Sequence, residues 1–386
     1  MRNVVIGGIT GLVAGVVIGA TIVAPQLDIA ARGPTAGAAI ADGPPGNGVR
    51  ETPSPTLPID RDSSVRWRMV SAYAAALPQL GTLAKRVETE ITRVSGGRFE
   101  VRLFDPDTVV STDDLFEAVE SGTIDAAFAS PSRWADKDPA FDLFAAVPFG
   151  PEPAEYLAWI YFGGGRELFE RLLRRRNVHA LFCGLIAPEA AGWFRSEVNT
   201  VDDLGGLRMR ITGLGAKVMT RLGATALSMD GDETFITLEK GALEAAEFFT
   251  PAVDAALDFR RLGKHYYFPG WHQPATLFAL IVNKDRWREA DSESRAQIET
   301  VCGDNIRHGL AEGEALQFAA LVEMGAQGVK MHRWSDAILD ALEAAWRNVV
   351  EDESAKNANF KRAWDSLSSF RRDYAIWSEL GYARGR

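Results

Sequence analysis

Cysteine and histidine, which build many metal and redox centres, are scarce in this sequence. Its 386 residues include two cysteines, Cys183 and Cys302, and five histidines, which show no spacing typical of metal ligands. No CxxC occurs, so no disulfide framework is indicated. The two cysteines could pair or stay buried as free thiols, and the second interpretation is favoured because small buried thiols are common.

Common enzyme motifs and positive charge are also lacking. GxSxG, GxxxxGK(S/T) and HExxH are absent, and GLGAKV carries only two of the three glycines of GxGxxG. These absences lower the expectation of catalysis without excluding it. The net charge of −10 disfavours a nucleic-acid binder, and an anionic ligand would need a local positive site.

Apolar residues, in contrast, are abundant enough for sizeable cores. They make up 46% of the chain and include ten tryptophans and twenty phenylalanines. The length fits two or three domains.

The first 25 residues are predicted to be a transmembrane anchor or a signal peptide. The run from Val4 to Ala24 is uncharged, and its 21 residues can span a bilayer as a helix. Glycines recur in it every four residues, which gives one smooth face for helix packing in lipid. A cleaved signal peptide stays open as the alternative. Either way, Arg2 stays on the cytoplasmic side and the rest is expected in the periplasm.

Residues 26–63 are predicted to form a flexible linker. They contain six prolines, five glycines and no aromatic residue, so they cannot bury enough apolar surface to become ordered. The folded part therefore begins near Ser64.

Strand and helix patterns alternate from Val65 onward, which is typical of an α/β fold. Two segments also resemble each other: FEAVESGTIDAAFA from Phe116 and FITLEKGALEAAEF from Phe235. Each reads as a helix, a glycine stop and a strand, so the chain is expected to contain two similar lobes.

The two copies differ at one position near the strand end. Phe128 of the first copy corresponds to Glu247 of the second. A carboxylate at the end of an apolar strand is costly unless it is paired, hydrogen-bonded or bound to a cation. Glu247 is thus a candidate functional residue, and a strand-end glutamate that reaches water is the alternative.

The stretch GLRMRITGLG predicts a strand with one apolar and one cationic face, followed by the start of a helix. Ligands of α/β sheets gather at the carboxyl ends of strands and at helix N-termini. Arg210 is nearest that end, and its planar guanidinium can hold a carboxylate with two hydrogen bonds. Arg208 lies further back and is expected to be an ordinary surface charge.

These segments resemble the solute-binding proteins of tripartite ATP-independent periplasmic (TRAP) transporters, the DctP family. The resemblance rests on DDLGGLRMRITGLGAKVMTRLGAT, LEAAEFFTP, KHYYFPGWHQP and LIVNKDRW, and covers Val65 to the C-terminus. The branch that binds 2-oxo acids and lactate is the most similar. The resemblance implies a two-lobe α/β periplasmic-binding-protein-like fold with a hinge and a ligand cleft.

The family pattern also assigns roles to residues of this chain. Arg210 matches the arginine that binds the ligand carboxylate. Glu247 and Phe248 match positions that hold a cation, usually Na⁺ or Ca²⁺. Glu189 stands where the branch has Gln, another cation ligand, and a glutamate can bind a hard cation through oxygen. Tyr73 stands where the branch often has Trp, on the first cleft loop.

The chain departs from the pattern at several pocket positions. The branch usually has Trp at Phe248, an aromatic residue at Arg133 and a Tyr-Asn pair where Ala252 and Val253 stand. A larger or more apolar acid, or one whose second carboxylate faces Arg133, is therefore expected. A pair between Glu189 and Arg133, which would leave no cation, is the rival interpretation.

Two tryptophans and the chain crossings complete the expected architecture. Trp193 and Trp271 are either pocket walls or core residues, and packing is favoured. Lobe I is expected at 64–186 plus 275–315, and lobe II at 187–274 plus 316–386. The stretch DAILDALEAAWRNVVEDE predicts an amphipathic helix that packs across both lobes or mediates dimers.

The sequence thus predicts a periplasmic protein that is not an enzyme. It is expected to capture a small organic monocarboxylate, with Na⁺ or Ca²⁺ bridging the ligand, for delivery to TRAP permease subunits. A sensor for a membrane signalling partner stays open. An exported enzyme with Glu247 or Glu189 as general base is a further alternative.

Overall fold

The computed structural model describes residues 64–382 apart from 230 and 262, and it omits the side chains of 231, 232 and 235. The expected anchor or signal peptide (1–25) and linker (26–63) lie outside the described residues, so both stay predictions. None of the helices that are described is long and apolar enough to cross a membrane.

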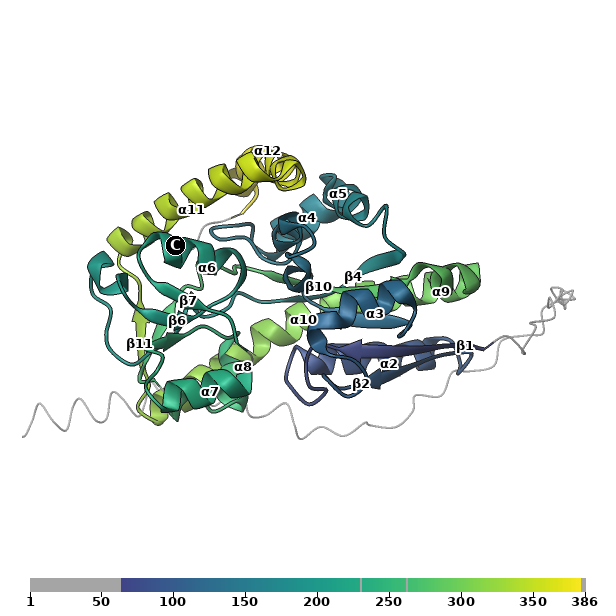
Figure 1. Cartoon of the computed structure of the whole chain (residues 1–386), viewed down its shortest axis with the longest axis horizontal. Coiled ribbons are helices and arrows are strands. Elements are labelled where there is room, and N and C mark those ends of the chain that lie inside the picture. The colour runs from purple at the N-terminus through teal and green to yellow at the C-terminus, as the bar shows by residue number, and fades with distance from the viewer. Residues whose placement is uncertain (1–63, 230, 262, 383–386) are drawn as a thin grey trace, which may run out of the picture. The chain divides into compact units, whose positions relative to one another are not determined.

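Two sheets form the centre of the fold, as Figure 1 shows. The first has the order β2-β1-β3-β10-β4 and the second the order β11-β9-β5-β8-β6-β7. The strands of the first sheet are β1 Val65–Ser71, β2 Phe99–Phe104, β3 Ala126–Ala129, β4 Val178–Ile186 and β10 Thr276–Asn283. Those of the second are β5 Gly192–Phe194, β6 Arg208–Arg210, β7 Thr225–Leu227, β8 Ala245–Ala246, β9 His265–Phe268 and β11 Lys330–Arg333. The expected α/β fold with two lobes is confirmed.

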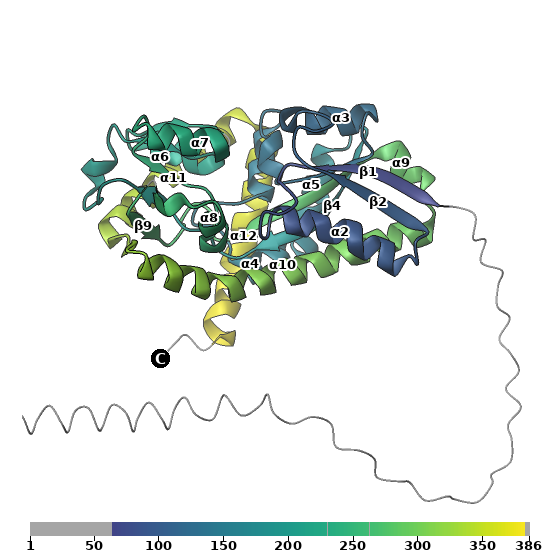
Figure 2. The same ribbon diagram turned by 90° about the horizontal axis from the view of Figure 1, so that it is seen from below.

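Helices cover both sheets. They are α2 Gly81–Val94, α3 Leu115–Ser121, α4 Pro153–Phe162, α5 Gly165–Leu172, α6 Gly213–Arg221, α7 Gly231–Glu239, α8 Pro251–Ala256, α9 Lys284–Glu289, α10 Ser292–Ala326, α11 Asp336–Lys356 and α12 Ala358–Gly381. The 35 residues of α10 run past elements of both sheets in Figure 2. It contacts β4 and α2 beside the first sheet and α8 beside the second. This one helix therefore connects the two lobes.

The duplicated segments occupy equivalent places in the two sheets. α3 leads into β3, and α7 leads into β8. β3 lies between parallel β1 and antiparallel β10, and β8 lies between parallel β6 and antiparallel β5. Gly122 and Gly241, which end the two helices, have φ angles of 80° and 73°, a conformation that only glycine adopts without strain.

The favoured interpretation of free cysteines is wrong, because Cys183 and Cys302 form a disulfide. Cys183 lies on β4 and Cys302 on α10, and Asn305 of α10 donates a hydrogen bond to the Cys183 carbonyl at 2.7 Å. The close packing of α10 on β4 brings the two sulfur atoms together. The predicted export was the signal for this pairing, since disulfides persist outside the cytoplasm.

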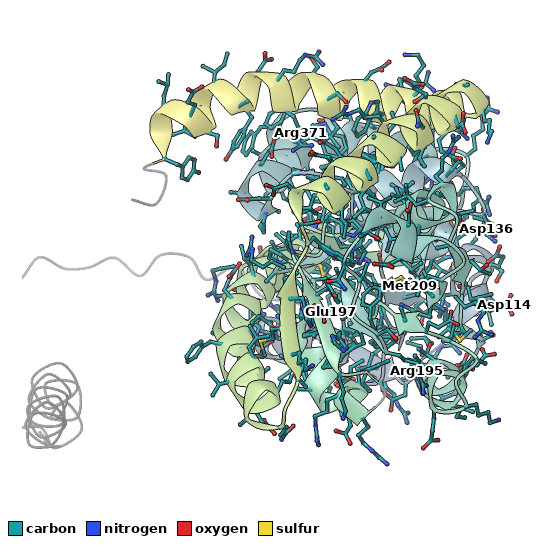
Figure 3. The ribbon with its side chains drawn as sticks, turned by 90° about the vertical axis from the view of Figure 1, so that its left-hand side faces the viewer. Asp114, Asp136, Arg195, Glu197, Met209 and Arg371 are labelled. Atoms are coloured by element: carbon teal, nitrogen blue, oxygen red, sulfur yellow. A yellow bond between two sulfur atoms is a disulfide. The ribbon has the colours of Figure 1, made fainter. Side chains whose placement is uncertain are left out.

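The lobe boundaries stay a prediction. The strands of the first sheet all lie within 64–186 and 275–315, and those of the second within 187–274 and 316–386. The C-terminal helix α12 nevertheless packs on α4 and α5 beside the first sheet. Arg371 of α12, labelled in Figure 3, donates to Glu155 at 3.2 Å and to the carbonyl of Phe149 at 2.8 Å.

Reduction of the disulfide is expected to lower the free energy of unfolding by about 2–5 kcal/mol, because the bond closes a long loop in the unfolded chain. The two cysteines are 119 residues apart. Denaturant titrations with and without reductant measure the difference. Cys302→Ala, which cannot form the bond, should show no effect of reductant. Two free thiols in the unreduced, unfolded protein would contradict the assignment.

His179 is expected to contribute a loss of stability at acidic pH, opposite in sign to the contributions of the buried acids Asp142 and Asp254, whose pKa values burial raises to about 7. Burial, with a smaller contribution from Arg166, lowers the pKa of His179 to about 4, and its ring stacks on Trp287 with centroids 4.0 Å apart. The unfolded chain takes up this proton below about pH 6.5, whereas the folded chain does not until about pH 4. The contribution is therefore present above pH 6.5 and lost as pH falls toward 4, by about 2 kcal/mol.

His179→Phe keeps the ring stack and should remove most of this loss in denaturant titrations between pH 7 and 4. His308→Phe is the matched control, since that side chain is 40% exposed, and it should retain the wild-type loss. An unchanged pH slope in His179→Phe would contradict the assignment.

Candidate functional site

Arg210, at the end of β6, is fixed against the neighbouring strand β8. Its Nη1 donates to the backbone oxygen of Glu247 at 2.7 Å and to Glu247 Oε2 at 3.0 Å. Its Nε donates to the carbonyl of Met229 at 3.2 Å, and its guanidinium carbon lies 5.0 Å from the centre of the Phe248 ring. These contacts hold the guanidinium in one orientation at the carboxyl end of β6 in the second sheet.

The two arginines of this strand differ sharply in environment. The side chain of Arg210 is 11% exposed and that of Glu247 only 1%, so this ion pair is buried. Arg208 is exposed and pairs with Glu244, with Nη2 and Oε1 2.7 Å apart. The sequence predicts the same distinction, because ligands of an α/β sheet bind outside the carboxyl ends of its strands and Arg210 is nearer that end.

Glu189, in the segment between β4 and β5, brings a second buried carboxylate to the site. Its Oε1 accepts from the hydroxyl of Thr276 at 2.7 Å, whereas its Oε2 has no partner. Its backbone oxygen accepts from Gly270 at 3.1 Å, an approach so close that a Cβ on Gly270 would lie 2.2 Å from it. Burial and the nearby Glu247 carboxylate raise the pKa of Glu189 well above its ordinary value.

His272 is a site residue that sequence reasoning missed. It is 2% exposed, neither ring nitrogen has a hydrogen-bond partner, and Nε2 lies 3.6 Å from Glu247 Oε1. The five histidines show no metal-ligand spacing along the chain, so spacing does not single out His272. The stretch GWHQP contributes to the family resemblance, but no local pattern in it marks His272 as a site residue.

The three side chains form a cluster that fits a cation. One donor atom from each of Glu189, Glu247 and His272 lies within 4.8 Å of the others. Glu189 Oε2 and Glu247 Oε1 both lack hydrogen bonds, and two buried carboxylates in contact repel each other unless a proton or a cation separates them. Unpartnered carboxylate oxygens are the ligands that Ca²⁺ prefers.

Tyr73 lies at the end of β1 beside this cluster. Its hydroxyl oxygen accepts from the backbone N–H of Ser130 at 3.4 Å, and its ring makes edge contacts with Phe249 and Phe278. Burial raises the pKa of Tyr73 to about 12. The ring therefore offers an apolar wall and a neutral hydroxyl.

Arg133 does not pair with Glu189. It is exposed at the surface, and its only ion pair among the described residues joins Nη2 to Asp113 Oδ1 at 3.4 Å. The rival interpretation, in which a pair between Arg133 and Glu189 leaves no cation, finds no such contact. Burial raises the pKa of Tyr73, and both Arg133 and Arg210 oppose this rise, so both contribute positive charge near that residue.

The two tryptophans are buried, and their role as pocket walls or core residues stays a prediction. Trp193 is fully buried, stacks on Tyr266 and donates from its indole to Asp254 Oδ2 at 2.8 Å. Asp254 Oδ1 in turn accepts from the backbone N–H of Phe249 at 3.2 Å. Trp193 therefore supports the loop behind Glu247. Trp271 is 5% exposed and stacks on Phe149, with ring centres 5.7 Å apart.

A family model described as bacterial extracellular solute-binding protein, family 7 (DctP), matches residues 70–357. The chain belongs to this family. A relative from Nostoc sp., named monocarboxylate 2-oxoacid-binding periplasmic protein, is 31% identical over 324 residues, which are 83% of this chain and 88% of the relative. The family consists of transport proteins that bind solutes, so this DctP protein is extracytoplasmic by family.

Solved structures of TRAP solute-binding proteins have the same fold. One from Bordetella bronchiseptica RB50, with copurified calcium and picolinate, has a TM-score of 0.80 and 28% identity and covers 83% of this chain and 95% of its own. One from Pseudoalteromonas atlantica T6c, with sodium and pyruvate, has a TM-score of 0.78 and 24% identity, with coverages of 82% and 97%. At that identity the second shows the fold alone.

Ca²⁺ is expected to stabilise this DctP protein through Glu247. A cation that binds only the folded state adds about 2.7 kcal/mol at one hundred times its Kd. Glu247→Gln keeps the shape but removes the charge, so it should abolish the response in denaturant titrations. Glu244→Gln, at the exposed start of the same strand, is the matched control and should respond as the wild type does. Equal responses of the two variants would contradict a cation at this cluster.

Proposed function

We propose that this chain captures a small organic monocarboxylate, a 2-oxo or hydroxy acid, together with a cation. It delivers the acid to the permease subunits of a TRAP transporter. The observation that carries the proposal is the buried Arg210, paired with Glu247 next to a cluster of Glu189, Glu247 and His272 that could hold a cation. The names of the Nostoc relative and of the two solved structures, with 2-oxoacid, picolinate and pyruvate, support this ligand class.

The proposed division of labour follows from the charges. Arg210 binds the ligand carboxylate, since its guanidinium is held in place and partly shielded from water. Glu247, Glu189 and the backbone carbonyl of Phe248 would hold the cation, which would neutralise the two carboxylates and attract an oxygen of the acid. Tyr73 forms one wall of the pocket. Binding of the acid through these contacts requires no covalent bond to be made or broken.

The proposal places the folded part in the periplasm, with 1–25 either retained as an anchor or removed as a signal peptide. An anchored form would reach the membrane permease through the linker 26–63. A cleaved form would reach it by free diffusion. The homodimer stays a hypothesis for this chain.

Arg210→Ala is expected to weaken binding of pyruvate by about 30-fold or more, because removing one partner of a buried charge pair costs about 2–5 kcal/mol. Isothermal titration calorimetry with Ca²⁺ present measures the Kd. Arg210→Lys keeps the charge but loses the planar fork, so it should also weaken binding while preserving stability better than alanine.

Arg208→Ala is the matched control for this prediction. It removes an exposed arginine from the same strand and should leave the Kd within about twofold, as expected for an exposed ion pair. Retained affinity in Arg210→Ala, or an equal loss in both variants, would sink the proposed function.

A further inference from the structure

A small hollow lies beside the site just described, at the start of α6. Its lining includes Ser132, Asp142, Thr212, Gly213, His272 and Gln273. His272 borders the carboxylate cluster as well as the hollow, and Thr212 follows Arg210 by two residues. The hollow has room for one or two water-sized groups. A ligand held by Arg210 would therefore have this hollow next to it.

One wall of the hollow offers hydrogen-bond donors. The nine-residue helix α6 begins at Gly213, and its N-cap residue Thr212 makes no side-chain capping bond. The first N–H groups of a helix have no partner within the helix. They carry the positive end of the helix dipole, so this wall favours an oxygen atom.

The opposite wall carries a buried acid. Asp142 is 2% exposed, its Oδ1 has no hydrogen-bond partner, and that oxygen lies 3.6 Å from where a Cβ would stand on Gly213. A buried carboxyl oxygen without a partner is costly. Its position next to the uncapped start of α6 therefore indicates a bound group that would hydrogen-bond both to this oxygen and to the first N–H groups of the helix. Burial raises the pKa of Asp142 to about 7.

We propose that this hollow is a subsite for a further hydroxyl group of the ligand, in addition to the oxygen on its C2, which makes the preferred ligand a small 2-oxo or hydroxy acid with one extra hydroxyl. A hydroxyl accepts from the N–H groups of α6 and donates to Asp142 at the same time. It also bonds to the acid in either protonation state. The inference rests on the proposed function, because Arg210 must hold the carboxylate for the hydroxyl to reach Asp142.

Other groups fit the two walls less well. An ammonium group could donate to Asp142 but would face the positive end of α6. A second carboxylate would suit α6 but would face Asp142, and Arg133, the nearby cation expected to receive it, is exposed and bound to Asp113. An apolar group would leave both walls without hydrogen bonds.

Two pairs of acids that differ by one hydroxyl test the subsite: lactate against glycerate, and 2-hydroxybutanoate against 2,4-dihydroxybutanoate. Isothermal titration calorimetry on the whole folded protein with Ca²⁺ gives each Kd. In at least one pair, the wild type should bind the acid with the additional hydroxyl about tenfold tighter than its partner, as expected for one hydrogen bond to a buried acid.

Asp142→Leu should remove this preference while the Kd of the plain acid stays within about twofold. Asp136→Leu is the matched control, since Asp136 is an exposed acid of the same region, and it should keep the preference. Two results would overturn the subsite and leave the proposed function standing. One is equal affinity of the wild type for the two acids of each pair, and the other is an equal loss of affinity for both acids in Asp142→Leu. If no acid binds the wild type, both proposals fall.

Discussion

The buried pair of Arg210 and Glu247 is the constraint on which the site depends. Withdrawing two charges from water costs several kcal/mol per ion unless hydrogen bonds replace the lost hydration. Here Glu247 supplies both a side-chain oxygen and its backbone carbonyl to the same guanidinium nitrogen. The equivalent strand of the first sheet carries Phe128, which is fully buried. The second sheet therefore contains a buried ion pair, with its desolvation cost, at the position where the ligand is proposed to bind. The first sheet has an apolar side chain at the equivalent position.

The surroundings of this pair are arranged to keep it in place. Asp254 fixes the loop that follows Glu247 through the N–H of Phe249. At Thr250, where α8 begins, the hydroxyl donates to Gln79 Oε1 at 3.3 Å, and Gln317 of α10 donates to the same oxygen at 3.3 Å. The loop that carries the charges is therefore connected to the first lobe and to the helix that joins the lobes.

Local pattern was enough to predict part of the fold and of the site. The period of two in GLRMRITG placed both arginines on one face, and the nearness of Arg210 to the carboxyl end of the strand separated it from Arg208. The repeated helix–glycine–strand unit singled out Glu247. Both signals lie in short stretches of sequence, so they can be recognised without the tertiary structure. His272 and Asp142 could not be found in this way, since neither stands in a pattern that differs from ordinary packing. Cys183 and Cys302 were read wrongly for the same reason, because nothing near either cysteine specifies its partner.

The sequence by itself determined the α/β alternation, the two similar lobes and the strand whose end carries Arg210, because hydrophobic period and glycine stops act over a few residues. Only the tertiary structure decided that Glu189, Glu247 and His272 share one cluster and that α10 places Cys302 on Cys183. It also decided that Asp142 faces the start of α6. These meetings depend on how the sheets and helices pack, and packing joins residues whose separation along the chain carries no information about their distance in space.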